Sequence, residues 1–291
     1  MKFRGIECTE ALRMLELSVV IPVLDEVDYL GPCLDHLLDQ EGDIDEIIVV
    51  DNGSSDGTCE LVESYRERTD KIVLIHEAKR GVVHARNAGF ERASGDVLGR
   101  IDADTRVRPG WARSVKSFLQ NDPSYAAVAG TAYLYESPWA SAQHKLHDRE
   151  VAQWGPVRSM VAASGNNFAI RRSAWEAVRD SASCRVDLHE DIDLSLCLRA
   201  KELPLAQYTE MRVELSGRRG ITSPARYYFY ARAGYRAYKR HGLESATLRR
   251  VVFVDWLMHS LRWPVCRLVG TGASRPLPVR QDQQPQPVTV G

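Results

Sequence analysis

The segment Val97-Leu98-Gly99-Arg100-Ile101-Asp102-Ala103-Asp104-Thr105 places two carboxylates directly after a short apolar run. In an extended chain the side chains of residues i and i+2 point the same way, so Asp102 and Asp104 can converge while Ala103 points elsewhere. Two carboxylates this close repel each other and resist ionising together. Mg²⁺ or Mn²⁺ removes that conflict, because it binds carboxylate oxygens and completes its coordination with water and phosphate. Ordinary solvated turns also contain Asp-x-Asp, so the surrounding sequence has to decide.

The residues around this segment alternate between apolar runs and stretches of helical character. Strands are predicted at 17–23, 46–50, 71–76 and 97–101, and helices at 29–40, 59–68, 82–92 and from Pro109, as the first helical residue, to 119. Such alternation predicts βαβ units and a parallel sheet, whose ligand lies beyond the carboxyl ends of the strands. Pro22, Asp51 and Asp102 fall at such ends. One crevice can therefore hold all three.

Length and composition are those of a globular protein, with 291 residues and 44% hydrophobic content, enough for one α/β domain with an appendage. The six cysteines show no zinc-like spacing, which indicates thiols in a reducing compartment. No signal peptide is recognisable, so we expect a cytoplasmic protein. Neither G-x-G-x-x-G nor G-x-x-x-x-G-K-[ST] is present. This disfavours dinucleotide-dependent dehydrogenases and P-loop NTPases, and a nucleotide here would be held by carboxylates, arginines and a metal.

Five motifs follow one another between residues 17 and about 200. They are Val20–Glu26 with a Pro-x-x-Asp-Glu turn, Val49–Thr58, Gly81–Gly89 with Gly-x-x-x-Ala-Arg-Asn-x-Gly, Ile101–Thr105 and His189–Leu194. Together they resemble the family 2 glycosyltransferases, whose nucleotide loop reads Val-Asp-Asp-Gly-Ser-x-Asp-Gly-Thr. The resemblance implies an α/β fold of the GT-A type with a mainly parallel central sheet, followed here by a helical, basic C-terminal extension.

The resemblance also implies a reaction, in which a sugar moves from a nucleotide-diphosphate donor, UDP- or GDP-linked, to a hydroxyl acceptor with inversion at the anomeric carbon. By position, Asp51 would accept a hydrogen bond from the base. Pro22 and Glu26 would line the base and ribose site, and Arg86 would lie near the nucleotide. The expected partners are this donor and a glycan or lipid-linked acceptor of the cell envelope, and no nucleic acid.

The resemblance also implies a role for the Asp-x-Asp pair. Asp104 would coordinate Mg²⁺ or Mn²⁺, and Asp102 would contact the ribose or reach the metal through water. A divalent cation suits this chemistry because it stabilises the negative charge that grows on the departing diphosphate. No leaving-group acid is then required.

The catalytic base is expected in the last motif. An acceptor hydroxyl attacks only when a base takes its proton, and Asp191 is our choice because the start of a helix stabilises its negative charge. Glu190 is placed in the acceptor region. The competing interpretation is that these are ordinary first-turn carboxylates of a helix, and Asp193 is assigned to that group.

Two further segments have open interpretations. Gly165 and Asn166, in Ser164–Asn167, either form the floor of the donor-sugar and acceptor site or belong to a tight turn before a strand. Arg218 and Arg219 either close over the donor diphosphate, for which arginine suits bidentate binding, or belong to a basic surface turn.

The C-terminal third is strongly basic although the net charge is −1: residues 212–280 carry 14 Lys/Arg against three Asp/Glu. A helix is predicted at 224–241. The apolar run 251–269 is interrupted by charged residues, which argues against a spanning helix. The segment either lies peripherally on the inner face of the cell membrane or packs against the acidic catalytic domain.

The expected organisation is an N-terminal extension at 1–16, a GT-A catalytic domain at 17–215, a basic helical segment at 216–270 and a disordered tail at 271–291. Two other classes stay as alternatives. A non-catalytic nucleotide-sugar binding protein would lack the metal pair or the base. A sugar-phosphate nucleotidyltransferase would have a Gly-rich loop after its first strand, and residues 22–28 contain no glycine.

Overall fold

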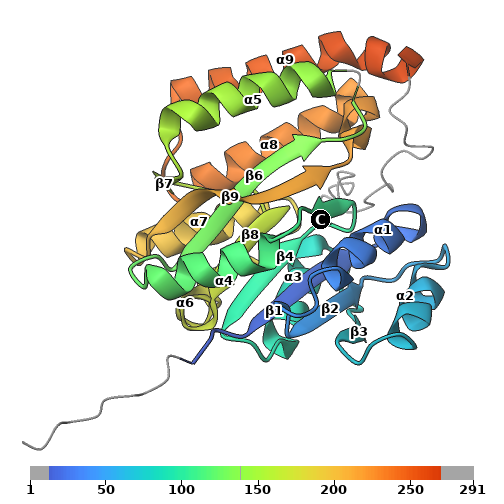
Figure 1. Ribbon diagram of the computed structural model, residues 1–291. Helices are drawn as coiled ribbons and strands as arrows, with labels where there is room; N and C mark the ends of the chain where they lie inside the picture. Colours follow the sequence, from blue (N-terminus) through green and yellow to red (C-terminus); the bar gives the residue numbers. More distant parts are fainter. Residues whose placement is uncertain (1–12, 138, 270–291) are drawn as a thin grey trace, which may run out of the picture.

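A nine-stranded mixed sheet forms the centre of the protein in a computed structural model, which describes residues 13–137 and 139–269 (Figure 1). The strand order is β3-β2-β1-β4-β8-β6-β9-β5, and β7 pairs with β9. The strands are β1 (Leu17–Val23), β2 (Glu46–Asp51), β3 (Ile72–His76), β4 (Val97–Ile101), β5 (Thr105–Val107), β6 (Ala127–Leu134), β7 (Val157–Met160), β8 (Asn167–Arg171) and β9 (Leu205–Leu215).

The first half of the sheet is parallel, as the sequence predicts. β1 pairs in parallel with both β2 and β4, and β2 pairs in parallel with β3. These four strands lie within one residue of the predicted bounds. Antiparallel pairs begin at β8, which lies between β4 and β6. The carboxyl ends of β1, β2 and β4 therefore meet at one edge, and this edge carries the first four motifs.

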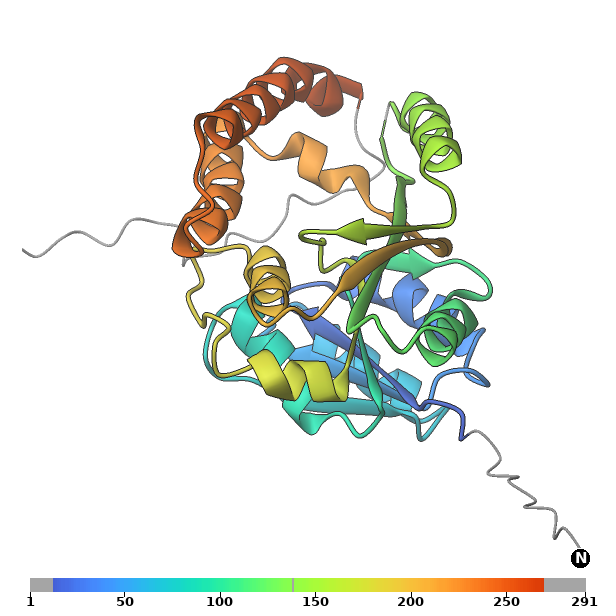
Figure 2. The same ribbon diagram turned by 90° about the vertical axis from the view of Figure 1, so that its left-hand side faces the viewer.

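Helices cover both faces of the sheet (Figure 2). They are α1 (Val27–Leu38), α2 (Thr58–Arg66), α3 (Val82–Arg92), α4 (Trp111–Asn121), α5 (Ala140–Trp154), α6 (Arg172–Val178), α7 (Glu190–Ala200), α8 (Pro224–Arg240) and α9 (Ala246–Val269), with a 3₁₀ turn η1 at Gly217–Ile221. One buried core lies between the sheet and α1, α2 and α4, and a second lies under α3, α6 and α7. The fold is thus a three-layer α/β/α arrangement with a helical C-terminal part.

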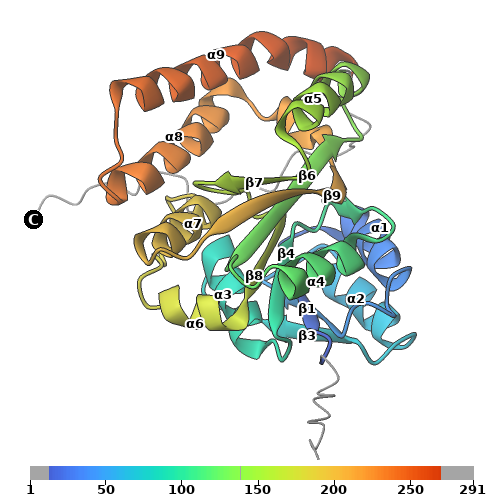
Figure 3. The ribbon, with the colours of Figure 1, turned by 60° about the vertical axis from the view of Figure 1, so that its left-hand side comes forward.

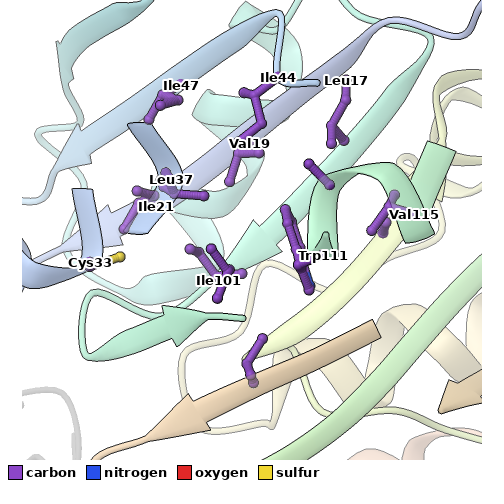
Figure 4. Close-up of a cluster of buried hydrophobic side chains, with 14 of the residues drawn as sticks. Leu17, Val19, Ile21, Cys33, Leu37, Ile44, Ile47, Ile101, Trp111 and Val115 are labelled. Carbon is purple, nitrogen blue, oxygen red and sulfur yellow. The ribbon is translucent and has the colours of Figure 1, made fainter. Parts of the chain in front are cut away.

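The predicted start of α4 is wrong. Pro109 is not its first helical residue, because Gly110 follows in the left-handed region, with φ +84°, and the helix starts at Trp111. Trp111 then reaches the middle of the core (Figure 4). Its Nε1 donates to Oδ1 of Asn167 at 2.8 Å, and Asn167 donates in turn to the backbone carbonyls of Thr131 and Met211. These buried hydrogen bonds join α4 to β8, which carries Asn167, and to β6 and β9.

The C-terminal helices lie at one end of the molecule (Figure 3). The predicted helix 224–241 is confirmed as α8, and the apolar run 251–269 is confirmed as part of α9, which begins five residues earlier. No helix in 13–137 or 139–269 is long and apolar enough to cross a membrane. The proposed tail 271–291 and most of the proposed N-terminal extension lie outside the described residues.

Candidate functional site

Asp51 is the last residue of β2 and is almost fully buried. Its carboxylate accepts the backbone N–H groups of Ser54 at 2.9 Å and Gly53 at 3.1 Å, and it lies 3.1 Å from Nδ1 of His76. Burial acts to raise the pKa of Asp51, but the hydrogen bonds from Ser54, His76 and Gly53 outweigh it and leave the pKa below its ordinary value. Asp51 is therefore an ionised acceptor at the strand end where the sequence predicts the base site.

The Asp-x-Asp segment forms a turn rather than the extended chain expected for it. Thr105 closes this turn: its Oγ1 accepts from the N–H of Asp102 at 3.2 Å, and its own N–H donates to the carbonyl of Asp102 at 3.0 Å. Consequently the two carboxylates pair with different arginines. Asp102 lies 2.9 Å from Arg100, and Asp104 accepts from Nε of Arg218 at 2.8 Å.

Arg218, a candidate diphosphate ligand in the sequence analysis, binds carboxylates in the structure. Its guanidinium binds both oxygens of Glu26, at 2.7 and 2.8 Å, as well as Asp104, and it stacks 4.2 Å from the ring centre of Tyr29. Only 5% of Arg218 is exposed. One buried cation thus joins the end of β1, the Asp-x-Asp turn and the C-terminal region.

The backbone around Arg218 is fixed by its neighbours. Ser216 caps η1, since its Oγ accepts the N–H of Arg218 at 3.2 Å and donates to Glu136 at 2.6 Å. Gly217 packs so tightly that a Cβ there would lie 1.7 Å from the carbonyl oxygen of Glu136. Any larger residue at 217 would therefore displace the turn. Arg219, on the same turn, stacks on the ring of Tyr230 at 4.1 Å.

Electrostatics at this site favour a cation. Burial, with the charges of Asp104 and Asp102, raises the pKa of Glu26 to about 7 despite its contact with Arg218. Burial and the charge of Asp102 likewise raise the pKa of Asp104 against the opposing effect of Arg218. Carboxylate oxygens are the ligands that Mg²⁺ and Mn²⁺ prefer, and the guanidinium already stands where a positive charge is needed. The residues present therefore fit a divalent cation.

The Glu-Asp segment lies next to the Asp-x-Asp turn. Asp191, in the first turn of α7, accepts the backbone N–H of Gly165 at 2.8 Å. Glu190 is buried and lies 3.2 Å from Arg100, the arginine that also contacts Asp102. Arg100 therefore links the two motifs.

The segment before β8 lies between these motifs. A Cβ on Gly165 would lie 2.2 Å from a guanidinium nitrogen of Arg100, so only glycine fits there without displacing that arginine. The carbonyl of Asn166 accepts from Oγ1 of Thr105 at 3.4 Å. The structure thus places Gly165 next to Arg100 and Asn166 next to Thr105, and their part in acceptor binding stays a prediction.

Arg86 is fully buried beneath α7. It lies over the ring of Trp175 at 5.5 Å, and its Nη1 lies 3.5 Å from the carbonyl of Glu190. Burial lowers the pKa of Arg86 although Glu190 opposes this. Within the described part of the chain, Nη2 of Arg86 and Nε of Arg100 lack hydrogen-bond partners. Both arginines line a small cavity, together with Phe90, Gly165, Phe168, Glu190, Asp191 and Leu194.

The sequence analysis missed three residues of this site, which are Arg100, Tyr29 and Ser216. A signal existed for Arg100, because a charged residue inside the apolar run 97–101 has to find a partner when it is buried. No comparable signal exists for Tyr29 or Ser216, whose roles depend on contacts between distant parts of the chain. Cys33 is also close, buried under the carbonyl of Asp102.

Comparison with known proteins agrees with this arrangement. The family description "Glycosyl transferase family 2" matches residues 18–193. The chain is 30% identical over 193 residues to the putative glycosyltransferase EpsH of Bacillus subtilis, covering 63% of this chain and 55% of that protein. It is 36% identical over 134 residues to the uncharacterized glycosyltransferase YibD of Escherichia coli, covering 46% of this chain and 39% of that protein. It therefore spans about half or less of the length of these relatives.

Among solved structures, the fold is similar to that of the mannosyltransferase PcManGT from Pyrobaculum calidifontis, with a TM-score of 0.63 at 18% identity, covering 91% of this chain and 77% of that one. This likeness confirms the GT-A fold. The family description spans the first four motifs and all of the fifth except Leu194, and it covers more than half of the chain. On this evidence, the protein belongs to glycosyl transferase family 2.

Proposed function

We propose that the protein is a metal-dependent inverting glycosyltransferase, which moves a sugar from a UDP- or GDP-linked donor to a hydroxyl acceptor. The observation that carries the proposal is the pairing of carboxylates with two buried arginines. Arg218 binds Glu26 and Asp104, and Arg100 binds Asp102 and Glu190, the neighbour of Asp191. In support, the structure of the Pyrobaculum mannosyltransferase is a complex with GDP-Man and Mn²⁺.

Asp104 and Asp102 would hold the metal, Mg²⁺ or Mn²⁺. Such an ion, when bound, acts as a Lewis acid on the diphosphate and stabilises the charge of the leaving group. Asp51 supplies an ionised acceptor for the base, and Pro22, in β1 opposite Val50, lies beside the strand that carries Asp51. Glu26, which follows β1, adds a carboxylate at the same edge of the sheet.

Asp191 is the proposed base. Its carboxylate is held by the N–H of Gly165 and lies at the start of α7, where the helix dipole favours negative charge. It takes the proton of the acceptor hydroxyl while that oxygen bonds to the anomeric carbon and the bond to the diphosphate breaks. Attack from the side opposite the leaving group inverts the configuration. Glu190 serves as a positioning residue, because it holds Arg100 against Asp102.

Arg218 would exchange partners during this cycle. In the structure it neutralises Glu26 and Asp104, so its guanidinium has to leave Asp104 before another cation binds there. A diphosphate, like the carboxylates that Arg218 leaves, offers pairs of anionic oxygens that a guanidinium can bind with two parallel hydrogen bonds. Arg219 carries a second charge on the same short turn. We propose that both arginines close over the donor diphosphate.

Replacing Arg218 with glutamine tests this exchange. Mn²⁺ added alone should bind roughly tenfold more tightly to Arg218→Gln, because a competing charge close to Asp104 is gone. UDP or GDP should bind more weakly relative to the bare nucleoside, because the diphosphate has lost a partner. Calorimetry measures both, and Arg226→Gln, an exposed site on α8, is the matched control. Weaker Mn²⁺ binding in Arg218→Gln would mean that Arg218 maintains the site instead of competing for it.

The activity itself is tested by a screen. Thermal unfolding should be followed with uridine and guanosine diphosphates and their sugar conjugates, each with Mn²⁺ and with EDTA. One nucleotide should stabilise the protein, and mainly when Mn²⁺ is present, since a ligand that binds the folded state raises its stability. Incubation of that donor with glycan and lipid-linked acceptors, followed by mass spectrometry, then identifies the product. No stabilisation by any donor would contradict the proposal.

The acceptor and the location belong to the same proposal. We assign a lipid-linked or cell-envelope glycan as acceptor and the cytoplasmic side of the membrane, with peripheral contact, as the location. Two observations support this: the five cysteines in the described ranges are free thiols, and the exposed residues of α8 and α9 are rich in arginine.

A further inference from the structure

Helix α9 has two faces of different character. The inner face is held to the rest of the protein by side chains that donate to backbone carbonyls. Trp256 donates to Pro224 at 2.9 Å and Trp263 donates to Ile221 at 3.1 Å. Cys266, on the same face, is buried, and its Sγ would lie 3.4 Å from a Cβ placed on Gly220. One side of α9 is thus fixed to α8 and η1.

The outer face of α9 is apolar and exposed along its length. Leu261 is 64% exposed and Leu268 is 87% exposed. Seven more large apolar side chains of this helix are exposed: Val251, Phe253, Val254, Leu257, Met258, Val265 and Val269. At 100° per residue, Val254, Leu257, Leu261, Val265 and Leu268 project on one line, opposite the two tryptophans. A continuous apolar surface of this kind marks an interaction site.

Basic residues flank this outer face. Arg249, Arg262 and Arg267 are exposed beside the apolar stripe, and Arg250 lies in line with it near the start of the helix. Asp255 is the single acidic residue of α9 and is held by Tyr227 at 2.9 Å. An apolar stripe bordered by arginines is the pattern of a helix that lies in the plane of an anionic membrane surface. Two copies of this face would bring the same arginines together, which disfavours a dimer.

The position of α9 suits such a contact. In all three views it lies along an outer edge of the molecule, away from the parallel strands (Figures 1, 2 and 3). Helix α5 lies near the same end of the molecule (Figure 1). Charged residues interrupt the apolar run of α9, and within the described residues no helix is long and apolar enough to cross a membrane.

We propose that the outer face of α9 docks on an anionic bilayer, with its apolar stripe at the boundary of headgroups and acyl chains. This proposal assigns the peripheral membrane contact proposed above to a particular helix face. It rests on the proposed function in one respect only, namely that the acceptor is lipid-linked. The 3₁₀ turn that carries Arg218 packs against α9. Docking therefore brings the membrane surface to the element that closes the donor site.

Vesicle sedimentation tests the docking. The full chain should bind vesicles of phosphatidylcholine and phosphatidylglycerol at low salt, and binding should fall steeply at high salt because screening weakens the arginine contacts. Leu257→Glu/Leu261→Glu should reduce binding roughly tenfold or more, because docking would bury both leucine side chains and would have to bury two charges in their place. Met14→Glu, at a side chain 62% exposed far from α9 in the sequence, should bind like the parent. Circular dichroism checks that the variants fold.

Two outcomes would overturn the docking. One is failure of the parent to bind anionic vesicles at low salt. The other is a concentration-dependent dimer in ultracentrifugation that Leu257→Glu/Leu261→Glu abolishes, because a second copy would then cover the face. Stabilisation by nucleotide and Mn²⁺ is measured on the same samples without lipid. A double variant that still binds nucleotide but has lost vesicle binding separates this proposal from the proposed function.

Discussion

Asp191→Asn should lower sugar transfer by roughly 10²–10⁴-fold, while the affinity for the donor stays unchanged. The amide is nearly isosteric with the carboxylate and its oxygen can still accept the N–H of Gly165, so α7 should keep its place. It cannot take the proton of the acceptor, because an amide is not a base in water. The loss should therefore appear in the rate of the chemical step.

The measurement separates binding from turnover. Donor affinity comes from calorimetry in the presence of Mn²⁺, and the rate comes from product formation at saturating donor. Asp180→Asn, an exposed aspartate between α6 and α7, is the matched control and should behave like the parent. Loss of donor affinity together with activity would instead place Asp191 in the donor site, and full activity would assign the base to another residue.

The parallel half of the fold follows from local sequence. Runs such as Ile47–Val50 and Val97–Ile101 are short, apolar and separated by helical stretches, and a strand buried on both faces requires this pattern. The later strands are less regular. β9 runs from Leu205 to Leu215 and pairs with β5, β6 and β7, and several of its residues are polar or charged. Periodicity alone does not specify a strand of this kind.

The site follows from sequence only in part, because motif order brings the strand ends together but does not determine which charges pair. The contact between Glu26 and Arg218 joins residues 192 positions apart, and it exists because the chain returns over the crevice after β9. The sequence predicts a basic turn at 216–220, but it does not indicate that Arg218 in this turn pairs with Glu26. The turn at Asp102 likewise depends on Thr105, whose hydroxyl accepts the N–H of Asp102.

Asp104→Asn should remove most of the metal-dependent affinity for the donor nucleotide. A neutral amide is a poor ligand for a hard divalent cation, and the loss of one ligand should weaken nucleotide binding by roughly 10²-fold or more in the presence of Mn²⁺. The fold should persist, because the amide oxygen still accepts from Nε of Arg218 and Glu26 continues to bind that guanidinium at two points.

Calorimetry with Mn²⁺ and then with EDTA distinguishes the metal from the rest of the site. In the parent, EDTA should weaken nucleotide binding strongly, and in Asp104→Asn it should change little, because little metal is bound. Asp148→Asn, on the surface of α5, is the control and should keep the full response to EDTA. Combining Asp104→Asn with Arg218→Gln adds a second test, since removing the competing guanidinium can restore Mn²⁺ binding only if Asp104 is present to receive it. Identical nucleotide affinities with Mn²⁺ and with EDTA in the parent would show that Asp104 pairs with Arg218 for structural reasons alone.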